Sequence, residues 1–305
     1  MAKDMTFEEF KTEVIENIKA YLPTDYEDAE LSVETINKAG VRYEGLLIRL
    51  DTPSMSCTPV LNLSRAYFDE YTHGRPLESI LEEFARVRVT AAKKLPIKKE
   101  DFLDYNKIKD RIVPKLVNTE NNMKYLANKA IITMEDLSIV FVVRTIEKDG
   151  IADAAITHDL LNLWKVTLAE VKEQAIKNFE TSPFKFENLL DAMLHQNTPD
   201  IEDIDLDEYE VPVFIVSNEQ NTQGAGMVLN PYLMNRVIEK LGDVYIVPSS
   251  VDEVLVLPKN AGPALNDLIN MVTSVNTESV KPEDRLSNNI YEYDKETNLL
   301  RLAKV

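Results

Sequence analysis

Apolar segments that meet in pairs across tight turns constrain the fold of this chain more than any other feature of its sequence. In the first pair, the turn ends at Gly40, a residue that can take the positive φ angle that tight turns need. A second pair turns around Glu135-Asp136. Segments joined this tightly predict β-hairpins, whose strands are antiparallel. The paired segments are residues 31–36 with 41–50, 130–134 with 137–146, and 290–293 with 299–302.

Amphipathic helices are predicted between these hairpins. Thr6 with Glu9, and Thr167 with Glu170, have the spacing of capping boxes, in which a hydroxyl and a carboxylate satisfy free amides at a helix start. Ser182-Pro183 also predicts a helix start, because proline is tolerated in the first turn. The expected helices cover residues 6–22, 76–92, 121–128, most of 156–195, 231–241 and 264–275, and the remaining strands cover 59–63, 111–117, 211–217, 225–229, 244–248 and 251–257.

These patterns predict an α+β fold with mixed, antiparallel-rich sheets and packed helices. The middle and C-terminal parts both run strand, helix and hairpin, which is either a duplicated unit or a common arrangement used twice. A chain of 305 residues predicts two domains. We expect an N-terminal region over residues 1–199, an acidic linker or loop over 200–210, and a C-terminal region over 211–305.

The charge of the chain limits its partners. The sequence holds 52 acidic and 34 basic residues, a net charge of −18. Such a surface repels nucleic-acid phosphates and anionic membranes, so we expect neither as a partner. A protein partner is expected instead, and a basic surface would complement the acidic one. The candidate acidic interaction segment is Asp200, Glu202, Asp203, Asp205, Asp207, Glu208 and Glu210, which can also be read as a solvated loop.

The sequence favours a cytoplasmic location. Cys57 is its one cysteine, so no internal disulfide can form. The first residues lead into an amphipathic pattern without the apolar core of a secretion signal. Apolar runs such as residues 139–143 are much shorter than the ~20 residues that span a bilayer.

Recognisable catalytic and cofactor motifs are missing from the sequence. Cys57 and the histidines His73, His158 and His195 lie outside any protease or zinc signature, so no metal or cofactor is expected. The acids from Asp203 onward resemble a calcium loop, but Glu208 and Phe214 stand where that loop needs glycine and glutamate. Gln223-Gly224-Ala225-Gly226 lacks the further residues of a nucleotide-binding loop and predicts a turn. Four aromatic residues, Tyr67, Phe68, Tyr71 and Trp164, are expected in the core rather than on a recognition surface.

Polar residues at the ends of apolar strands form the best candidate pocket. Ser249 and Ser250 follow Pro248 between two expected strands, and Glu253 comes just after them. Together with Asn218 these residues predict a polar pocket. The alternative is a hairpin corner in which the serines hydrogen-bond to the local backbone.

Several stretches resemble an uncharacterised protein family of unknown function that is widespread in gut clostridia. The most specific is Pro248-Ser249-Ser250 followed by Glu253-Val254. The resemblance implies one architecture over most of the chain and a setting in mobile elements, and it implies no activity, cofactor or catalytic residue. The other similar stretches are residues 117–118 with Asn122, Ile156-Thr157 with Leu160, Trp164, Val166-Thr167 and Ala175, then 213–218, 224–225, 245–247, 275–280, 282–283, 286–287 and 290–291.

Two hypotheses of function follow from the sequence. The first is a non-enzymatic protein-interaction module with an acidic surface, because negative charge is abundant and no catalytic set is visible. The second is a hydrolase-like enzyme with a pocket near the Pro248-Ser249-Ser250 corner. Convergent active sites need no linear signature, so the second stays open at the level of sequence.

Overall fold

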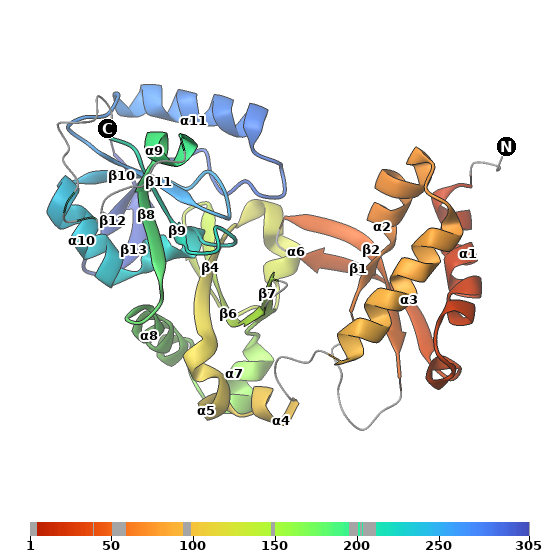
Figure 1. Ribbon diagram of the computed structural model, residues 1–305. Coiled ribbons are helices and arrows are strands. Elements are labelled where there is room, and N and C mark those ends of the chain that lie inside the picture. Colours follow the sequence, from red (N-terminus) through yellow and green to blue (C-terminus); the bar gives the residue numbers. More distant parts are fainter. Residues whose placement is uncertain are drawn as a thin grey trace. The chain divides into compact units, whose positions relative to one another are not determined.

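The chain divides into two compact units in the computed structural model (Figure 1). Unit 1 covers Met1–Phe102 and unit 2 covers Leu103–Val305. Strands pair in antiparallel sheets and helices pack against them, so the predicted α+β class is confirmed. The structure describes residues 5–38, 40–50, 59–93, 99–147, 150–194, 201, 203 and 212–304.

Unit 1 is a small three-stranded sheet covered by helices. Its strands have the order β1-β2-β3, and Gly40 takes a φ of 77° in the predicted turn between β1 and β2. The predicted Thr6–Glu9 capping box is formed at the start of α1. Its elements are α1 (Phe7–Asn17), short turns at Ile18–Tyr21 and Thr24–Tyr26, β1 (Glu30–Lys38), β2 (Val41–Arg49), β3 (Leu61–Asn62), α2 (Leu63–Arg65), a π-helical turn (Ala66–Glu70), a 3-10 turn (Tyr71–His73), α3 (Leu77–Lys93) and α4 (Lys99–Phe102).

Aromatic rings hold α1 against the centre of unit 1. Tyr67 and Tyr71 pack against the core beside Phe10, as predicted, whereas Phe68 is more than half exposed. Phe68 instead covers the outer edge of Tyr67, with ring centroids 4.9 Å apart. The predicted burial of Trp164, in unit 2, is confirmed.

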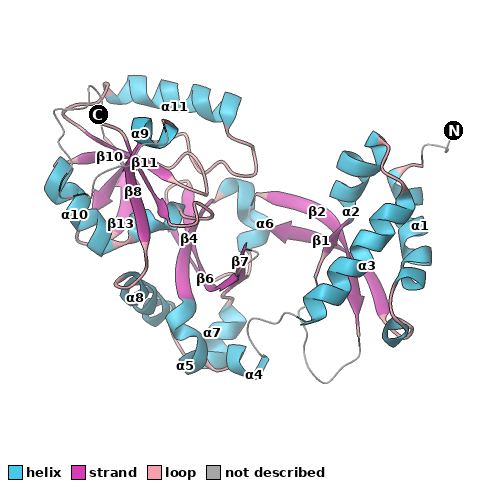
Figure 2. Ribbon diagram, viewed as in Figure 1, coloured by secondary structure: helices cyan, strands magenta, loops and turns pink. Residues whose placement is uncertain are grey.

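Unit 2 contains two antiparallel sheets. The first has the order β4-β6-β5, with β7 also paired to β6, and the second has the order β13-β12-β10-β11-β9-β8. Figure 2 shows the strands at the centre of this unit with α8, α10 and α11 around them. Its elements are α5 (Tyr105–Ile108), a turn at Lys109–Arg111, β4 (Ile112–Asn118), a turn at Glu120–Asn122, α6 (Met123–Leu126), β5 (Ile131–Met134), β6 (Leu137–Glu147), β7 (Gly150–Ala155), α7 (His158–Trp164), α8 (Leu168–Phe179), β8 (Phe184–Asn188), α9 (Leu189–Met193), β9 (Phe214–Asn218), η8 (Ala225–Leu229), α10 (Pro231–Leu241), β10 (Val244–Val247), β11 (Val254–Pro258), α11 (Leu265–Ser279), β12 (Tyr291–Asp294) and β13 (Leu299–Leu302).

The two sheets of unit 2 share one arrangement of three strands. In the first, β4 pairs with β6, which pairs with β5 across a tight turn. In the second, β9 pairs with β11, which pairs with β10. Helical segments follow β4 and β9 in both cases. The predicted run of strand, helix and hairpin therefore recurs with the same order of pairing.

Contacts from the C-terminal segment join these two sheets. Asp136, in the turn between β5 and β6, accepts hydrogen bonds from the Tyr291 hydroxyl and from Ser287 Oγ, the latter at 2.7 Å. Asn118 Nδ2 donates to the Leu286 carbonyl at 2.8 Å. Gly226 passes so close to β4 that an added Cβ would overlap the Pro114 carbonyl oxygen. Both sheets therefore belong to one packed body.

Two predicted elements are wrong. Ala225–Leu229 is a 3-10 helix rather than the predicted strand. The prediction failed because a short run that is buried throughout has no hydrophobic periodicity that distinguishes a helix from a strand. Ser182-Pro183 leads into strand β8 rather than a helix. Phe186 on this strand stacks on Phe214 of β9, so tertiary packing outweighs the local helix signal.

The segment around residue 200 does not separate the two units. The division between them falls after Phe102, and β8 and β9, on either side of the segment, pair in one sheet. The acidic linker at residues 200–210 stays a prediction, since among these residues only Ile201 and Asp203 are described. None of the helices in the described ranges combines the length and apolar character needed to cross a bilayer.

We expect Gly226→Ala to lower the free energy of unfolding of unit 2 by about 1–3 kcal/mol, because the new methyl group must displace backbone rather than a flexible side chain. Gly262→Ala is the matched control, since its Cβ would meet the end of the Leu257 side chain. Urea unfolding measures both changes. Equal effects of the two substitutions would contradict the close approach of Gly226 to β4.

Candidate functional site

Three loops meet at one end of the second sheet of unit 2, and we call residues 218–224, 248–253 and 281–287 the loop edge. The Leu286 N–H donates to the Ser249 carbonyl at 3.1 Å, and the Val251 N–H donates to the Asp284 carbonyl at 2.8 Å. The Gly224 N–H donates to the Asp252 carbonyl at 3.1 Å. The four predicted pocket residues, Asn218, Ser249, Ser250 and Glu253, thus lie on loops that contact one another.

Two side chains of the predicted pocket, Ser250 and Asn218, hydrogen-bond to backbone groups of these loops. Ser250 Oγ accepts from the Asp252 N–H at 3.2 Å. The Asn218 amide both accepts from the Thr222 N–H at 3.2 Å and donates to the Thr222 carbonyl at 2.8 Å. For Ser250, the geometry matches the hairpin-corner alternative. A pocket formed by all four residues stays a prediction.

The hydrolase hypothesis needs a base within hydrogen-bond reach of a serine hydroxyl. In the described part of the chain, neither Ser249 nor Ser250 has a hydroxyl hydrogen-bonded to a histidine or to a carboxylate side chain. His158 is exposed at the start of α7, and His73 belongs to unit 1. Cys57 and His195 lie outside the described residues.

Partly buried acids give the loop edge its electrostatic character. Burial raises the pKa of the Glu253 carboxyl; the Asp252 charge adds to this effect and Lys185 opposes it. Burial also raises the pKa of Asp284, again with a contribution from Asp252. The folded state therefore disfavours the charged form of both carboxyl groups. A raised carboxyl pKa can serve acid–base chemistry, but it also occurs wherever acids are crowded.

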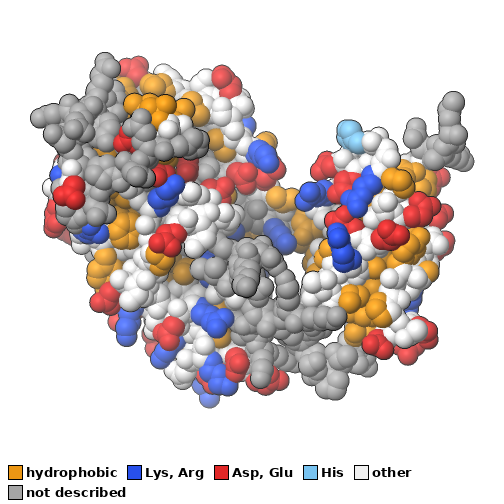
Figure 3. Space-filling view, in the orientation of Figure 1, with side chains coloured by type: hydrophobic (Ala, Val, Ile, Leu, Met, Phe, Trp, Pro, Cys, Tyr) orange, Lys and Arg blue, Asp and Glu red, His pale blue; other side chains and the backbone are white. Residues whose placement is uncertain are grey.

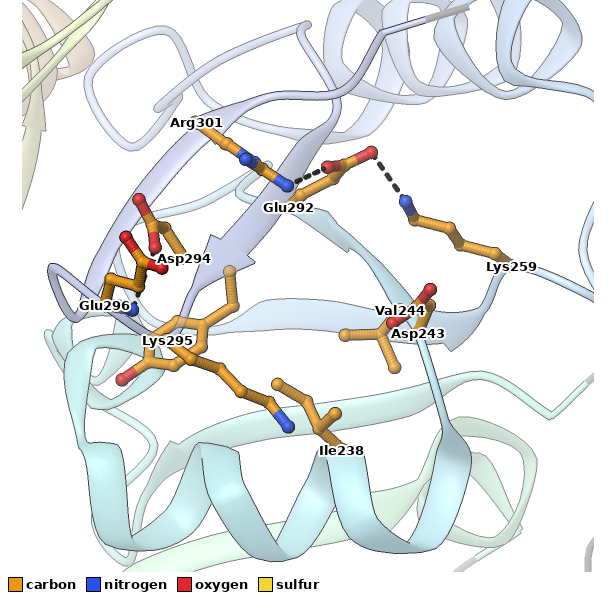
Figure 4. A pocket seen from close by; sticks show the side chains of 10 residues that line it. Ile238, Asp243, Val244, Lys259, Glu292, Asp294, Lys295, Glu296 and Arg301 are labelled. Atoms are coloured by element: carbon orange, nitrogen blue, oxygen red, sulfur yellow. Dashed lines mark hydrogen bonds and ion pairs between the residues drawn. The ribbon is translucent and has the colours of Figure 1, made fainter.

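A larger hollow lies on the face of β12 and β13, and sequence reasoning did not find it (Figure 4). It has a volume of about 360 Å³. Glu292 lies between Lys259, at 2.6 Å, and Arg301, at 3.2 Å. Backbone N–H donation from Glu296 holds the pKa of Asp294 below its usual range. The central carboxylate, Glu292, is thus paired on both sides, as in a structural ion-pair network.

Exposed apolar side chains on α9 and α11 form a third candidate, which we call the apolar surface. Leu190, Met193, Leu194, Met271 and Val275 are each more than half exposed. The Leu189 N–H at the start of α9 donates to the Val213 carbonyl at 2.8 Å. Val213 packs against the core cluster that holds three buried residues of α11, Leu265, Leu268 and Val272.

Figure 3 shows hydrophobic side chains gathered along α11. Met271 and Val275 are four residues apart, so they lie on one side of this helix. The charged residues of α9 and α11 are Asp191, Asp267 and Glu278, and neither helix carries lysine or arginine. The apolar surface is therefore accompanied by negative charge. The helical spacing of its residues could have indicated the apolar surface in the sequence, but the exposure of these side chains could not be read from the sequence.

Among the described residues, neither a metal-binding group nor the predicted acidic segment provides a further candidate site. Across the described ranges, no group of three or more His, Cys, Asp or Glu residues could hold a metal ion. Of the acidic segment, Asp203 is described and exposed, while Asp200, Glu202, Asp205, Asp207, Glu208 and Glu210 lie outside the described residues. The role of that segment stays a prediction.

The fold defines an α+β protein with two units. The model of a family described as "Family of unknown function (DUF5688)" matches residues 7–295, and the chain belongs to this family. The expected membership in an uncharacterised family over most of the chain is confirmed. A search of the curated proteins found no match, and a search of the solved structures found none.

We expect Glu253→Gln to make the protein more stable than the wild type at pH 7, with no difference below the pKa of an unfolded glutamate. Because the folded state raises the pKa of Glu253, stability is full at low pH and falls as pH rises and the carboxyl ionises. Thermal unfolding between pH 4 and pH 8 measures the difference. A destabilised variant at pH 7 would mean that the Glu253 carboxylate is held by a favourable partner.

Proposed function

We propose that this protein is a non-enzymatic interaction module of the cytoplasm, which binds a basic, amphipathic segment of a protein partner on the apolar surface of α9 and α11. The observation that carries the proposal is the set of large apolar side chains left exposed there: Leu190, Met193, Leu194, Met271 and Val275.

Exposed apolar area of this kind supports binding because water is released when a partner covers it. Isolated exposed apolar residues are ordinary, whereas a group of large exposed apolar side chains is typical of an interaction site. Two of the residues, Met193 and Met271, are methionines, whose flexible thioether chains adapt to different apolar partners. An amphipathic helix laid on such a surface would bury these side chains with its own apolar face.

Charge supports a basic partner over a neutral or acidic one. The helices α9 and α11 carry acids and no bases, and the whole chain has a net charge of −18. Lysine and arginine around the apolar face of a partner would be attracted to this surface, and salt would screen the attraction. The predicted acidic segment would add to it.

No specific observation favours the hydrolase alternative over this proposal. Ser250 and Asn218 are engaged by neighbouring backbone groups, and Glu292 in the larger hollow is engaged by two bases. A role in mobile elements rests on the sequence resemblance alone.

We expect the double variant Met271→Ser/Val275→Ser to bind a basic amphipathic peptide at least tenfold more weakly than the wild type. The probe is a synthetic helical peptide of lysine and leucine, with leucines at helical spacing. Burying one large apolar side chain contributes about 1.5–3 kcal/mol, and a tenfold change in affinity is about 1.4 kcal/mol. Fluorescence anisotropy measures the affinity at low and at moderate salt.

The matched control is Leu163→Ser, which removes an equally exposed apolar side chain from α7. It should bind like the wild type. A glutamate–leucine peptide with the same apolar spacing should bind more weakly than the lysine–leucine peptide. If Leu163→Ser reduces binding as much as the double variant does, peptide binding is unspecific and the proposed surface is refuted.

A further inference from the structure

A second, smaller hollow lies where the two sheets of unit 2 meet, away from the apolar surface of α9 and α11. Its wall includes Pro114 of β4, Phe179 at the end of α8, and Met227 of η8. Phe179 and Met227 are buried. Polar side chains also line it: Arg144 of β6, Ser182, and Asn218, Gln220 and Gln223 of the loop edge. The hollow thus has apolar walls and a few polar groups, the usual composition of a small-ligand site.

The backbone around this hollow is held in an uncommon conformation. Gln223 has a φ of 52° and Asn221 a φ of 47°. Both values lie in the left-handed region of backbone conformation, which residues other than glycine seldom adopt. The Gln223 N–H donates to the Asp252 carboxylate at 2.8 Å, which fixes the residue in this conformation. The close approach of Gly226 to Pro114 closes the same wall. The backbone of Gln223, from which its side chain extends, is therefore held in place by these contacts.

Within the described ranges, the Gln223 side-chain amide makes no hydrogen bond. Its Oε1 is buried and accepts no hydrogen bond, and within the described ranges its Nε2 makes none. A buried acceptor without a donor costs about 1–3 kcal/mol, so such a group is rare in a folded protein. A ligand that brings a donor into the hollow would remove this cost.

Arg144 offers the complementary donor. Its Nε and Nη2 donate to the two oxygens of Asp153 at 2.8 and 2.9 Å, and the side chains of both residues are largely buried. The other terminal nitrogen, Nη1, makes no hydrogen bond within the described part of the chain. Arg144 lines the hollow, and Asp153 neutralises its guanidinium, so Nη1 is available as a donor without an unbalanced positive charge.

We propose that this hollow binds a primary carboxamide, whose N–H donates to Gln223 Oε1 and whose carbonyl oxygen accepts from Arg144 Nη1. A carboxylate has no donor for Gln223 and would meet a guanidinium that Asp153 already neutralises. An amine has no acceptor for Arg144. The apolar wall takes a small aliphatic group attached to the carboxamide.

The size of the hollow agrees with a ligand of this kind. Its volume is about 80 Å³. On the scale where one water fills about 10–15 Å³, it holds on the order of six water-sized groups. A carboxamide with a short branched chain fills that space. The group can come from a free small molecule or from an asparagine or glutamine side chain of a partner.

The test is a nuclear magnetic resonance titration of the full chain with isobutyramide, isobutyrate and isobutylamine. The resonance pair of the Gln223 side-chain NH₂ is identified by its loss in Gln223→Met. We expect saturable shifts of this pair with isobutyramide, and binding of isobutyrate and isobutylamine that is at least fivefold weaker. Gln223→Met should weaken isobutyramide binding at least fivefold, whereas Gln174→Met, on the surface helix α8, should leave it unchanged.

Two blocked peptides distinguish the sources of the carboxamide, one with a central glutamine and one with a central leucine. Binding of the glutamine peptide as tightly as isobutyramide assigns the site to a partner side chain, and its exclusion assigns the site to a free small molecule. Equal binding of isobutyrate, unchanged binding by Gln223→Met, or no saturable shift with isobutyramide would overturn the proposal. The comparison of the three small molecules needs no variant, so it holds even if Gln223→Met fails to fold.

Discussion

The architecture of unit 2 depends on the hydrogen bonds that the Asp136 carboxylate accepts. It lies in the turn between β5 and β6 of the first sheet, and it accepts hydrogen bonds from Ser287 and Tyr291, which lead into the second. Burial, followed by the hydrogen bond to Asp136 and the charge of Asp136, raises the pKa of the fully buried Tyr291 hydroxyl. The hydroxyl therefore keeps its proton in the folded state and remains a donor to Asp136. Hydrogen bonds to a charged acceptor are among the stronger ones in proteins.

The loop edge and the small hollow depend on this junction. The loop edge includes residues 281–287, whose position is fixed by Asn118 and Asp136 from the first sheet. The small hollow takes one wall from β4 and β6 and the other from η8 and the loop before it. The helix α11 of the apolar surface packs on the core of the second sheet. A change at the junction should therefore affect the hollow more than the apolar surface.

Local signals in the sequence were sufficient to predict most helices and strands. The capping boxes at Thr6 and Thr167 are formed, and the predicted hairpins occur, because these features depend on residues a few positions apart. Strand β7 was not predicted, since its alanines and Gly150 lack an alternating pattern. Strand β8 was misread as helical because its pairing with β9 across residues 189–213 carries no local signal.

The sites were harder to predict than the fold. Four polar residues were predicted to lie together because of their places at strand ends: Asn218, Ser249, Ser250 and Glu253. Their hydrogen bonds could not be predicted from the sequence. Arg144 and Gln223 carry no motif, and they line one hollow because η8 packs on β4.

Amide hydrogen exchange tests most directly whether the two sheets of unit 2 form one body. In the wild type, buried amides of β6 and of β11 should open with the same free energy. Asp136→Ala should lower both values by the same amount, about 2 kcal/mol, because it removes the shared acceptor of Ser287 and Tyr291. Lower protection in β6 with unchanged protection in β11 would contradict the account, since the two sheets would then unfold independently.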